Sequence, residues 1–211
     1  MNKKKINIYI AGTVCLYCIM LLLILLKISN TGGMIRMADV NTKNLLTKIH
    51  MDITLLLPLV IVLGLNKLIC RTDSFKSLNI NLKNWKIIIV LILALIMQIL
   101  MKGVKNPCSY YSLFYYFAVI ALPEEIISRG IVYNQLKNIG EERAIILSGI
   151  VWGIMHSLLI WVQNGMGWNS IIRTIGLLIS YMIINHPIIF LYKKMDNLLI
   201  MIMLHAFVDA M

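Results

Sequence analysis

The chain has 211 residues, of which 60% are hydrophobic and 14% are charged. Soluble domains are about 45–50% apolar and about 25% charged, so this composition excludes an ordinary soluble domain and indicates a polytopic membrane protein. The formal net charge of +11 does not indicate nucleic-acid binding, because Lys and Arg cluster at the ends of apolar runs and are not interleaved with aromatic residues.

Seven apolar segments follow one another along the chain, most of them near the length of about 20 residues that a membrane-spanning helix needs. We predict an all-α transmembrane helical bundle of about seven spans. The expected spans cover residues 6–26, 50–69, 87–101, 110–136, 144–162, 170–192 and 197–211. The pattern shows no internal repeat, so we treat residues 1–211 as a single membrane domain, with three spans in residues 1–105 and four in residues 106–211.

Basic residues set the expected orientation of these spans. Lys3, Lys4 and Lys5 precede the first span, and a second basic stretch lies in residues 67–86, between the second and third spans. Under the positive-inside rule both stretches, and therefore the N-terminus, are cytoplasmic. The first span is longer than the apolar core of a cleaved signal peptide, so we expect it to be retained. The richness in Ile, Lys and Asn is typical of AT-rich bacterial genomes and favours a bacterial plasma membrane.

Three charged residues, Glu124, Glu125 and Arg129, lie inside the fourth expected span. A charged side chain at the centre of a bilayer costs roughly 2.5–3.5 kcal/mol on insertion scales, so such residues usually pair and serve a function. Glu125 and Arg129 are four residues apart and can pair on one helix face, whereas Glu124 lies about 100° round the helix. The pattern predicts one neutralised carboxylate and one that is free to act as a general base.

Two further spans carry polar residues at a similar depth. His156 stands one turn after Trp152 in the fifth span, and His205 and Asp209 share a helix face in the seventh. At about 1.5 Å per helical residue, Glu124, His156 and His205 all fall between the middle and the inner third of the bilayer. The catalytic interpretation depends on the hypothesis that these side chains converge on one pocket.

Small residues predict tight packing near His156. Gly149 and Gly153 form a G-x-x-x-G motif in the same span, and such a motif lets a neighbouring helix approach closely. We therefore expect another span to pass close to this histidine.

Three motifs occur in order, namely Glu-Glu-x-x-x-Arg, Trp-x-x-x-His and His-x-x-x-Asp. They resemble those of the CAAX protease and bacteriocin-processing family, also called Abi proteins, over the last four spans. The resemblance implies an intramembrane endopeptidase of the glutamate type. Family members remove the tripeptide after a lipidated cysteine, or take part in bacteriocin maturation, self-immunity and peptide signalling. We therefore expect a peptide or lipidated protein as substrate, at the lipid bilayer.

The resemblance also implies roles for the first two motifs. Glu124 would activate the attacking water, and His156 would position that water or act beside Glu124. Glu125 and Arg129 would hold the site in shape.

By the same resemblance, His205 and Asp209 would supply the oxyanion-stabilising end of the site. Two positions depart from the family pattern, because Trp152 stands where Phe is common and Asp209 stands where Asn is often found. An ionised Asp cannot donate a hydrogen bond, so the oxyanion would be bound by His205 or by a protonated Asp209.

The sequence leaves the cofactor and two other functions open. The resemblance favours a metal-free site, and no His-Glu-x-x-His motif is present, whereas a zinc site would use Glu124, His156 and His205. A non-catalytic bacteriocin self-immunity or regulatory membrane protein is one alternative function. A small ion- or proton-coupled transporter is another, although transporters often contain repeated halves.

Overall fold

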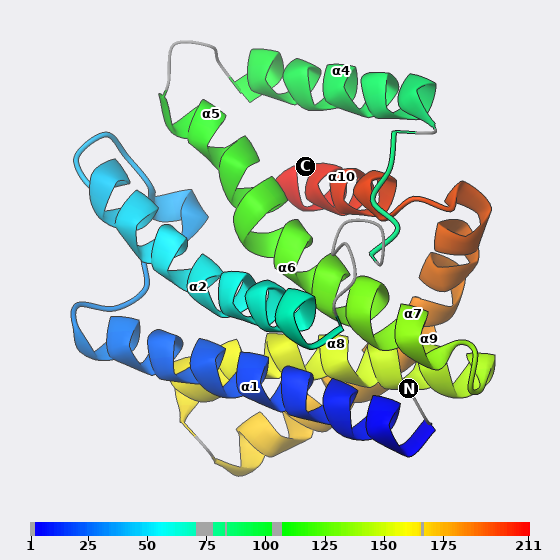
Figure 1. The fold of residues 1–211 in the computed structure, drawn as a ribbon. Coiled ribbons are helices and arrows are strands. Elements are labelled where there is room, and N and C mark those ends of the chain that lie inside the picture. Colours follow the sequence, from blue (N-terminus) through cyan, green and yellow to red (C-terminus); the bar gives the residue numbers. More distant parts are fainter. Residues whose placement is uncertain (1–2, 71–77, 83, 103–106, 166) are drawn as a thin grey trace.

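The computed structural model describes residues 3–70, 78–82, 84–102, 107–165 and 167–211 (Figure 1). Part of the basic stretch used to predict the orientation, including Arg71, Lys76 and Lys83, lies outside the described residues. Throughout the described ranges the chain is helical, apart from short linkers, and contains no strand, which confirms the all-α prediction.

Within the described residues, helices lie at each of the positions where the sequence predicts a span. Six of them are α1 (Lys3–Asn30), α2 (Leu45–Cys70), α4 (Trp85–Lys102), α8 (Glu141–Asn164), α9 (Trp168–Met195) and α10 (Leu198–Ala210). The other is a continuous rod over residues 107–136, made of α5 (Pro107–Phe114), η2 (Tyr115–Ala121), α6 (Leu122–Glu125), η3 (Ile126–Tyr133) and α7 (Asn134–Leu136). A short 3₁₀ turn, η1 (Met37–Asp39), lies between α1 and α2.

The rod runs through the molecule with α4 and α10 on one side and α1 and α2 on the other (Figure 1). Among the described residues, four helices are long and apolar enough to cross a membrane, by length and composition. They are Asn7–Asn30, Leu45–Leu68, Glu141–Asn164 and Trp168–Met195. The 13 residues of α10 extend about 20 Å, less than the hydrocarbon core of about 30 Å. The protein is therefore a membrane protein in which α10 covers only part of the bilayer thickness.

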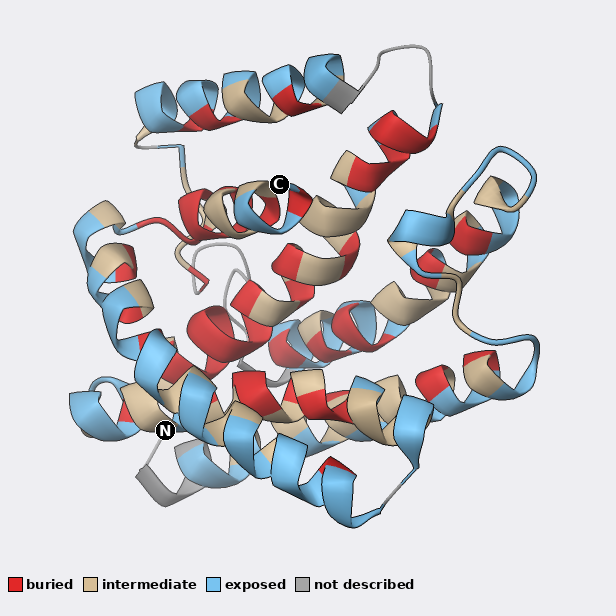
Figure 2. Cartoon of the chain, turned by 180° about the vertical axis from the view of Figure 1, so that it is seen from behind, coloured by how far each residue is buried: buried red, intermediate tan, exposed pale blue. Residues whose placement is uncertain are grey.

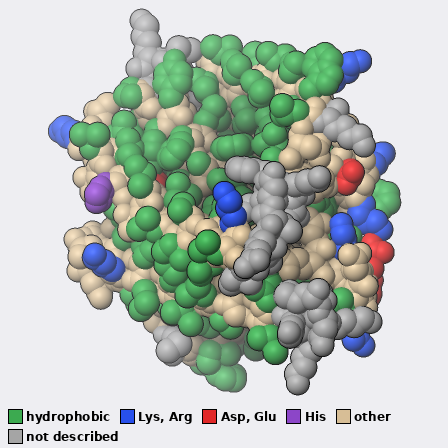
Figure 3. All heavy atoms as spheres, in the orientation of Figure 1, with side chains coloured by type: hydrophobic (Ala, Val, Ile, Leu, Met, Phe, Trp, Pro, Cys, Tyr) green, Lys and Arg blue, Asp and Glu red, His purple; other side chains and the backbone are tan. Residues whose placement is uncertain are grey.

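Apolar side chains face outward around the bundle, as contact with lipid requires. Buried positions concentrate on the rod and α10, while the outer faces of α1, α4 and α9 are exposed (Figure 2). Hydrophobic side chains far outnumber charged ones on the face seen in Figure 3. On α4 the exposed side chains include Trp85, Val90, Leu93, Met97 and Met101. A soluble helix would carry polar residues on such a face.

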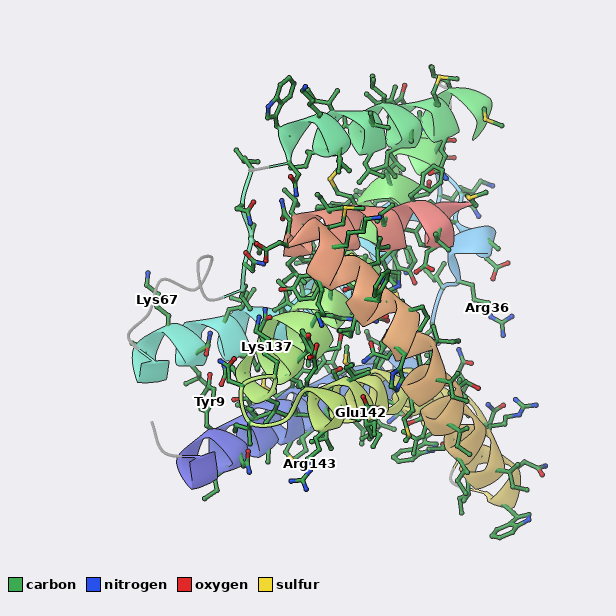
Figure 4. The ribbon with its side chains drawn as sticks, turned by 90° about the vertical axis from the view of Figure 1, so that its right-hand side faces the viewer. Tyr9, Arg36, Lys67, Lys137, Glu142 and Arg143 are labelled. Carbon is green, nitrogen blue, oxygen red and sulfur yellow. The ribbon has the colours of Figure 1, made fainter. Side chains whose placement is uncertain are left out.

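Basic residues lie mainly at one end of the bundle. Lys67, Lys137 and Arg143 lie toward the end where α1 begins, and Arg36 lies at the opposite end (Figure 4). By the positive-inside rule we expect the first end to face the cytoplasm, and this orientation stays a prediction.

The second helix begins at Leu45, earlier than the sequence predicts. Lys48 and Asp52 form a buried ion pair, with 2.7 Å between Nζ and Oδ1. Tyr111 of α5 donates a hydrogen bond to Asp52, and Lys48 Nζ lies 4.1 Å from the ring centre of Tyr115. Because these polar groups satisfy one another, the helix extends through residues that the hydropathy pattern assigns to a loop.

The rod widens into π-helix on both sides of α6. The backbone N–H of Leu122 bonds to the carbonyl of Phe117, and the N–H of Asn134 bonds to the carbonyl of Arg129, so each bond spans five residues. Pro123 lies at the start of α6 and has no N–H, so a regular α-helix cannot run unbroken through it. Short π segments are rare and occur frequently at functional sites.

Helices α8 and α9 approach closely at the two predicted glycines. A Cβ atom on Gly149 would lie 2.7 Å from the carbonyl oxygen of Tyr181, and one on Gly153 would lie 3.1 Å from Leu178 Cα. The buried Asn185 of α9 donates a hydrogen bond of 2.7 Å to the backbone of α8. The predicted close approach is therefore confirmed, and the neighbouring helix is α9.

Polar contacts from α4 and the segment before it hold α10 in place. Asn197 caps α10, because its side chain accepts the N–H of Leu199 at 3.0 Å and donates to the carbonyl of Asn81 at 2.6 Å. Gln98 of α4 donates to the carbonyl of Phe207 at 3.1 Å. These contacts fix the helix that carries the third motif.

Replacing Gly149 with Ala should destabilise the protein, because the added methyl group meets backbone atoms of α9. Overpacking of this kind costs about 1–3 kcal/mol. We expect Gly149→Ala to unfold at a lower temperature in detergent, measured by circular dichroism. The matched control is Gly176→Ala on α9, since nothing lies within 4 Å of a Cβ at that position. An equal effect in both variants would contradict the close contact.

Candidate active site

The structure brings the three motifs together in the interior of the bundle. Their seven residues lie on the rod (Glu124, Glu125 and Arg129), on α8 (Trp152 and His156) and on α10 (His205 and Asp209). Glutamates of the rod lie within 4 Å of side chains from both α8 and α10. Residues far apart in the sequence thus form one cluster of ionisable groups.

The Glu124 carboxylate lies between two imidazoles. Its Oε1 is 3.7 Å from His156 Nε2, and its Oε2 is 3.7 Å from His205 Nε2. Trp152 Nε1 donates a hydrogen bond of 2.6 Å to Oε2. The two histidine contacts are longer than direct hydrogen bonds, which leaves both imidazoles able to bind a third group beside the carboxylate.

Glu125 faces a different set of partners. Its Oε1 accepts a hydrogen bond of 3.0 Å from Arg129 Nη1, so the ion pair predicted from their spacing is present. The same oxygen lies 2.9 Å from His205 Nδ1, and since an ionised carboxylate only accepts, Nδ1 carries the hydrogen. Both members of the ion pair are fully buried. Glu125 therefore links the rod to α10 and turns His205 Nε2 toward Glu124 and toward Asp209, whose Oδ2 is 3.4 Å away.

Trp152 joins the two carboxylates to α8. Its indole N–H binds Glu124, and the guanidinium of Arg129 lies 4.0 Å from its ring centre. Arg129 Nη1 also contacts Ser128 Oγ at 2.9 Å, and Ser128 in turn donates to the Glu124 carbonyl. A Phe would keep the ring but lose the N–H, so this departure from the family pattern adds a hydrogen bond to Glu124.

One nitrogen of His156 is held by the backbone. Nδ1 lies 3.1 Å from the carbonyl oxygen of Trp152, which can only accept, so Nδ1 carries the hydrogen. This is the contact expected of a structural core histidine. Nε2 nevertheless remains directed at Glu124, so the contact orients the ring without occupying the nitrogen that faces the cluster.

A cavity of about 600 Å³ adjoins the cluster between α8, α9 and α10. His156, His205 and Asp209 lie on its border, while most of its remaining wall is apolar and includes Leu177 and Ile184 of α9. Glu125 also reaches this border, whereas the Glu124 side chain, which is 13% exposed, contacts the cavity through His156 and His205. An apolar cavity with a few convergent polar groups is the usual form of a site for small molecules or peptides.

Sequence analysis missed Tyr181 of α9, which also borders this cavity. Its ring centre lies 4.4 Å from that of Trp152 and 4.5 Å from that of His156. Its position in the sequence could have identified it, since a tyrosine at the middle of a long apolar span is far from the membrane interfaces that tyrosines favour.

No group of three or more His, Cys, Asp or Glu side chains within the described residues is arranged to hold a metal ion. The three residues suggested as zinc ligands, Glu124, His156 and His205, lie together but do not form such a group. The two histidines face different oxygens of the carboxylate, so they are not directed at one shared point.

The fold is that of a helical membrane protein with a cluster of ionisable residues in its interior. Residues 83–211 match the family described as Rce1-like, type II CAAX prenyl endopeptidase. Because this match covers more than half of the chain, the protein belongs to that family of membrane hydrolases, which confirms the resemblance found in the motifs. No curated protein and no solved structure matches the chain.

Removing the Arg129 side chain should unfold the site, because Glu125 would remain buried as an uncompensated charge. Breaking a buried pair in this way costs about 3–5 kcal/mol. We expect Arg129→Ala to be recovered from membranes in lower yield and to unfold at a lower temperature in detergent. Arg173→Ala is the control, since Arg173 is exposed on α9. Equal stability of the two variants would show that the buried pair is dispensable.

Proposed function

We propose that the protein is an intramembrane endopeptidase in which Glu124 activates a water molecule. The observation that supports this most strongly is the Glu124 carboxylate, which lies 3.7 Å from an imidazole nitrogen of both His156 and His205, the two histidines that border the cavity. A general base contributes typically about 10²–10⁴-fold to the rate. Membership of an endopeptidase family supports the same chemistry.

In the proposed reaction a water molecule is held by Glu124 and His156. Glu124 takes one proton as the water oxygen attacks the carbonyl carbon of the peptide bond, and the carbonyl oxygen becomes an oxyanion. The carbon–nitrogen bond then breaks. The proton passes from Glu124 to the leaving nitrogen, which restores the carboxylate and releases the two products.

The other motif residues have two roles. Glu125 and Arg129 hold the site in shape, and His205 faces the oxyanion. Glu125 and Arg129 neutralise each other and fix Nδ1 of His205. His205 Nε2, beside Asp209, is then the nitrogen available to the developing charge. Donors fixed in advance around an oxyanion are usually a large part of catalysis, because they need no reorganisation during the reaction.

The substrate we propose is a membrane-associated peptide that carries a prenylated cysteine or a leader segment. Two observations support an apolar substrate, namely the apolar cavity walls and the family to which the chain belongs. In a bacterial plasma membrane, a secreted peptide precursor would meet this description.

Replacing Glu124 with Gln should abolish cleavage while the protein stays folded. We expect a rate loss of about 10²–10⁴-fold, since the amide cannot accept the water proton. The assay is cleavage of a quenched fluorescent peptide with a farnesylated cysteine and three following residues. Glu142→Gln, an exposed carboxylate on the same protein, is the control and should keep the wild-type rate.

The same variants separate the peptidase from its rivals. His156→Ala should also be inactive as a peptidase, whereas an immunity partner should keep its protective effect in both variants. A proton relay should instead show pH-dependent flux in liposomes. If mass spectrometry finds identical membrane peptides in cells with the native protein and with Glu124→Gln, the peptidase proposal is wrong.

The proposed reaction uses no metal. We therefore expect the purified active protein to contain zinc well below one ion per chain, measured by plasma mass spectrometry. Treatment with 1,10-phenanthroline should leave the cleavage rate unchanged. A stoichiometric zinc ion whose removal stops cleavage and whose return restores it would instead assign Glu124, His156 and His205 as ligands.

A further inference from the structure

Tyr181 is the one tyrosine on the border of the cavity beside the motif cluster, among the described residues. Its ring packs against Trp152 and His156, at 4.4 and 4.5 Å between ring centres, so its position relative to the cluster is fixed. The close α8–α9 contact produces this placement, since a Cβ on Gly149 would meet the Tyr181 carbonyl.

The hydroxyl of Tyr181 has no hydrogen-bond partner among the described residues. Other tyrosines of the bundle are engaged, since Tyr192 on the same helix accepts from Asn134 at 2.8 Å and Tyr111 donates to Asp52. Tyr181 itself is only partly buried and borders the cavity. The hydroxyl of Tyr181 is therefore available to a group that enters the cavity.

The motif residues offer the proposed oxyanion few donors. An ionised Asp209 cannot donate, and Nδ1 of His205 is committed to Glu125. In the proposed reaction His205 is a doubly protonated imidazolium among Glu124, Glu125 and Asp209, so its Nε2–H is the single donor that the third motif offers to an oxyanion, whereas oxyanion sites commonly contain two. A phenol hydroxyl both fits the apolar wall and donates.

On the basis of the proposed function, we propose that the Tyr181 hydroxyl donates a hydrogen bond to the carbonyl oxygen of the scissile peptide bond as it becomes an oxyanion. The hydroxyl keeps its proton throughout, so Glu124 alone moves the proton from water to the leaving nitrogen. Tyr181 thus supplies the donor that an Asn in place of Asp209 would otherwise supply.

The test is Tyr181→Phe, which keeps the ring against Trp152 and His156 and removes only the hydroxyl. Cleavage of the farnesylated peptide should show kcat reduced about 100-fold, the usual effect of losing one oxyanion donor, with KM little changed. The unfolding temperature should stay at the wild-type value, because no described hydrogen bond is lost. Tyr192→Phe is the matched control on the same helix, and it should show the opposite result, a lower unfolding temperature with unchanged kcat.

Three results would overturn the proposal. They are a kcat for Tyr181→Phe within about threefold of wild type, a raised KM with unchanged kcat, or a loss of rate accompanied by a loss of stability like that of Tyr192→Phe. Failure of the peptidase itself is distinguishable. If the peptidase proposal fails, the wild-type protein does not cleave the peptide, or Glu124→Gln cleaves it as fast as the wild type. If only the role of Tyr181 is wrong, the wild type is active, Glu124→Gln is inactive and Tyr181→Phe cleaves as fast as the wild type.

Discussion

The buried carboxylate of Glu125 is the interaction on which the site depends. One oxygen of this side chain binds both Arg129 of the rod and His205 of α10, and the Arg129 guanidinium lies against Trp152 of α8. Three helices therefore share one charge-assisted network. Charged groups in a low-dielectric interior must be paired and hydrogen-bonded, so the network leaves these helices few other arrangements.

Two neighbouring glutamates acquire different tasks from their surroundings. Glu125 is 2% exposed and is neutralised by Arg129, so it acts on the site through the position of His205. Glu124 has no arginine partner and instead faces His156, His205 and the indole N–H of Trp152. The same side chain one residue along the helix is thus paired with an arginine in one case and faced by two imidazoles in the other.

Close packing and polar caps place the remaining walls of the cavity. Gly149 and Gly153 let α9 approach α8, which puts Tyr181 beside Trp152. The short helix α10 is held at its start by Asn197 and near its end by Gln98. The glycine contacts and the polar contacts of Asn197 and Gln98 all involve backbone atoms, so they fix the positions of the helices. The π-helical turns around α6 change the pitch of the rod at the Glu-Glu motif.

The sequence by itself determined the helical membrane fold, the Glu125–Arg129 pair and the close approach at Gly149, because hydropathy, four-residue spacing and small residues act locally along one helix. It also contained the motifs that identify the family. Only the tertiary structure decided that Glu124 faces both histidines, that Trp152 binds Glu124, that Lys48 and Asp52 extend α2 and that Tyr181 borders the cavity. Those contacts join different helices, and the relative rotation and depth of helices depend on packing that no single stretch of sequence specifies.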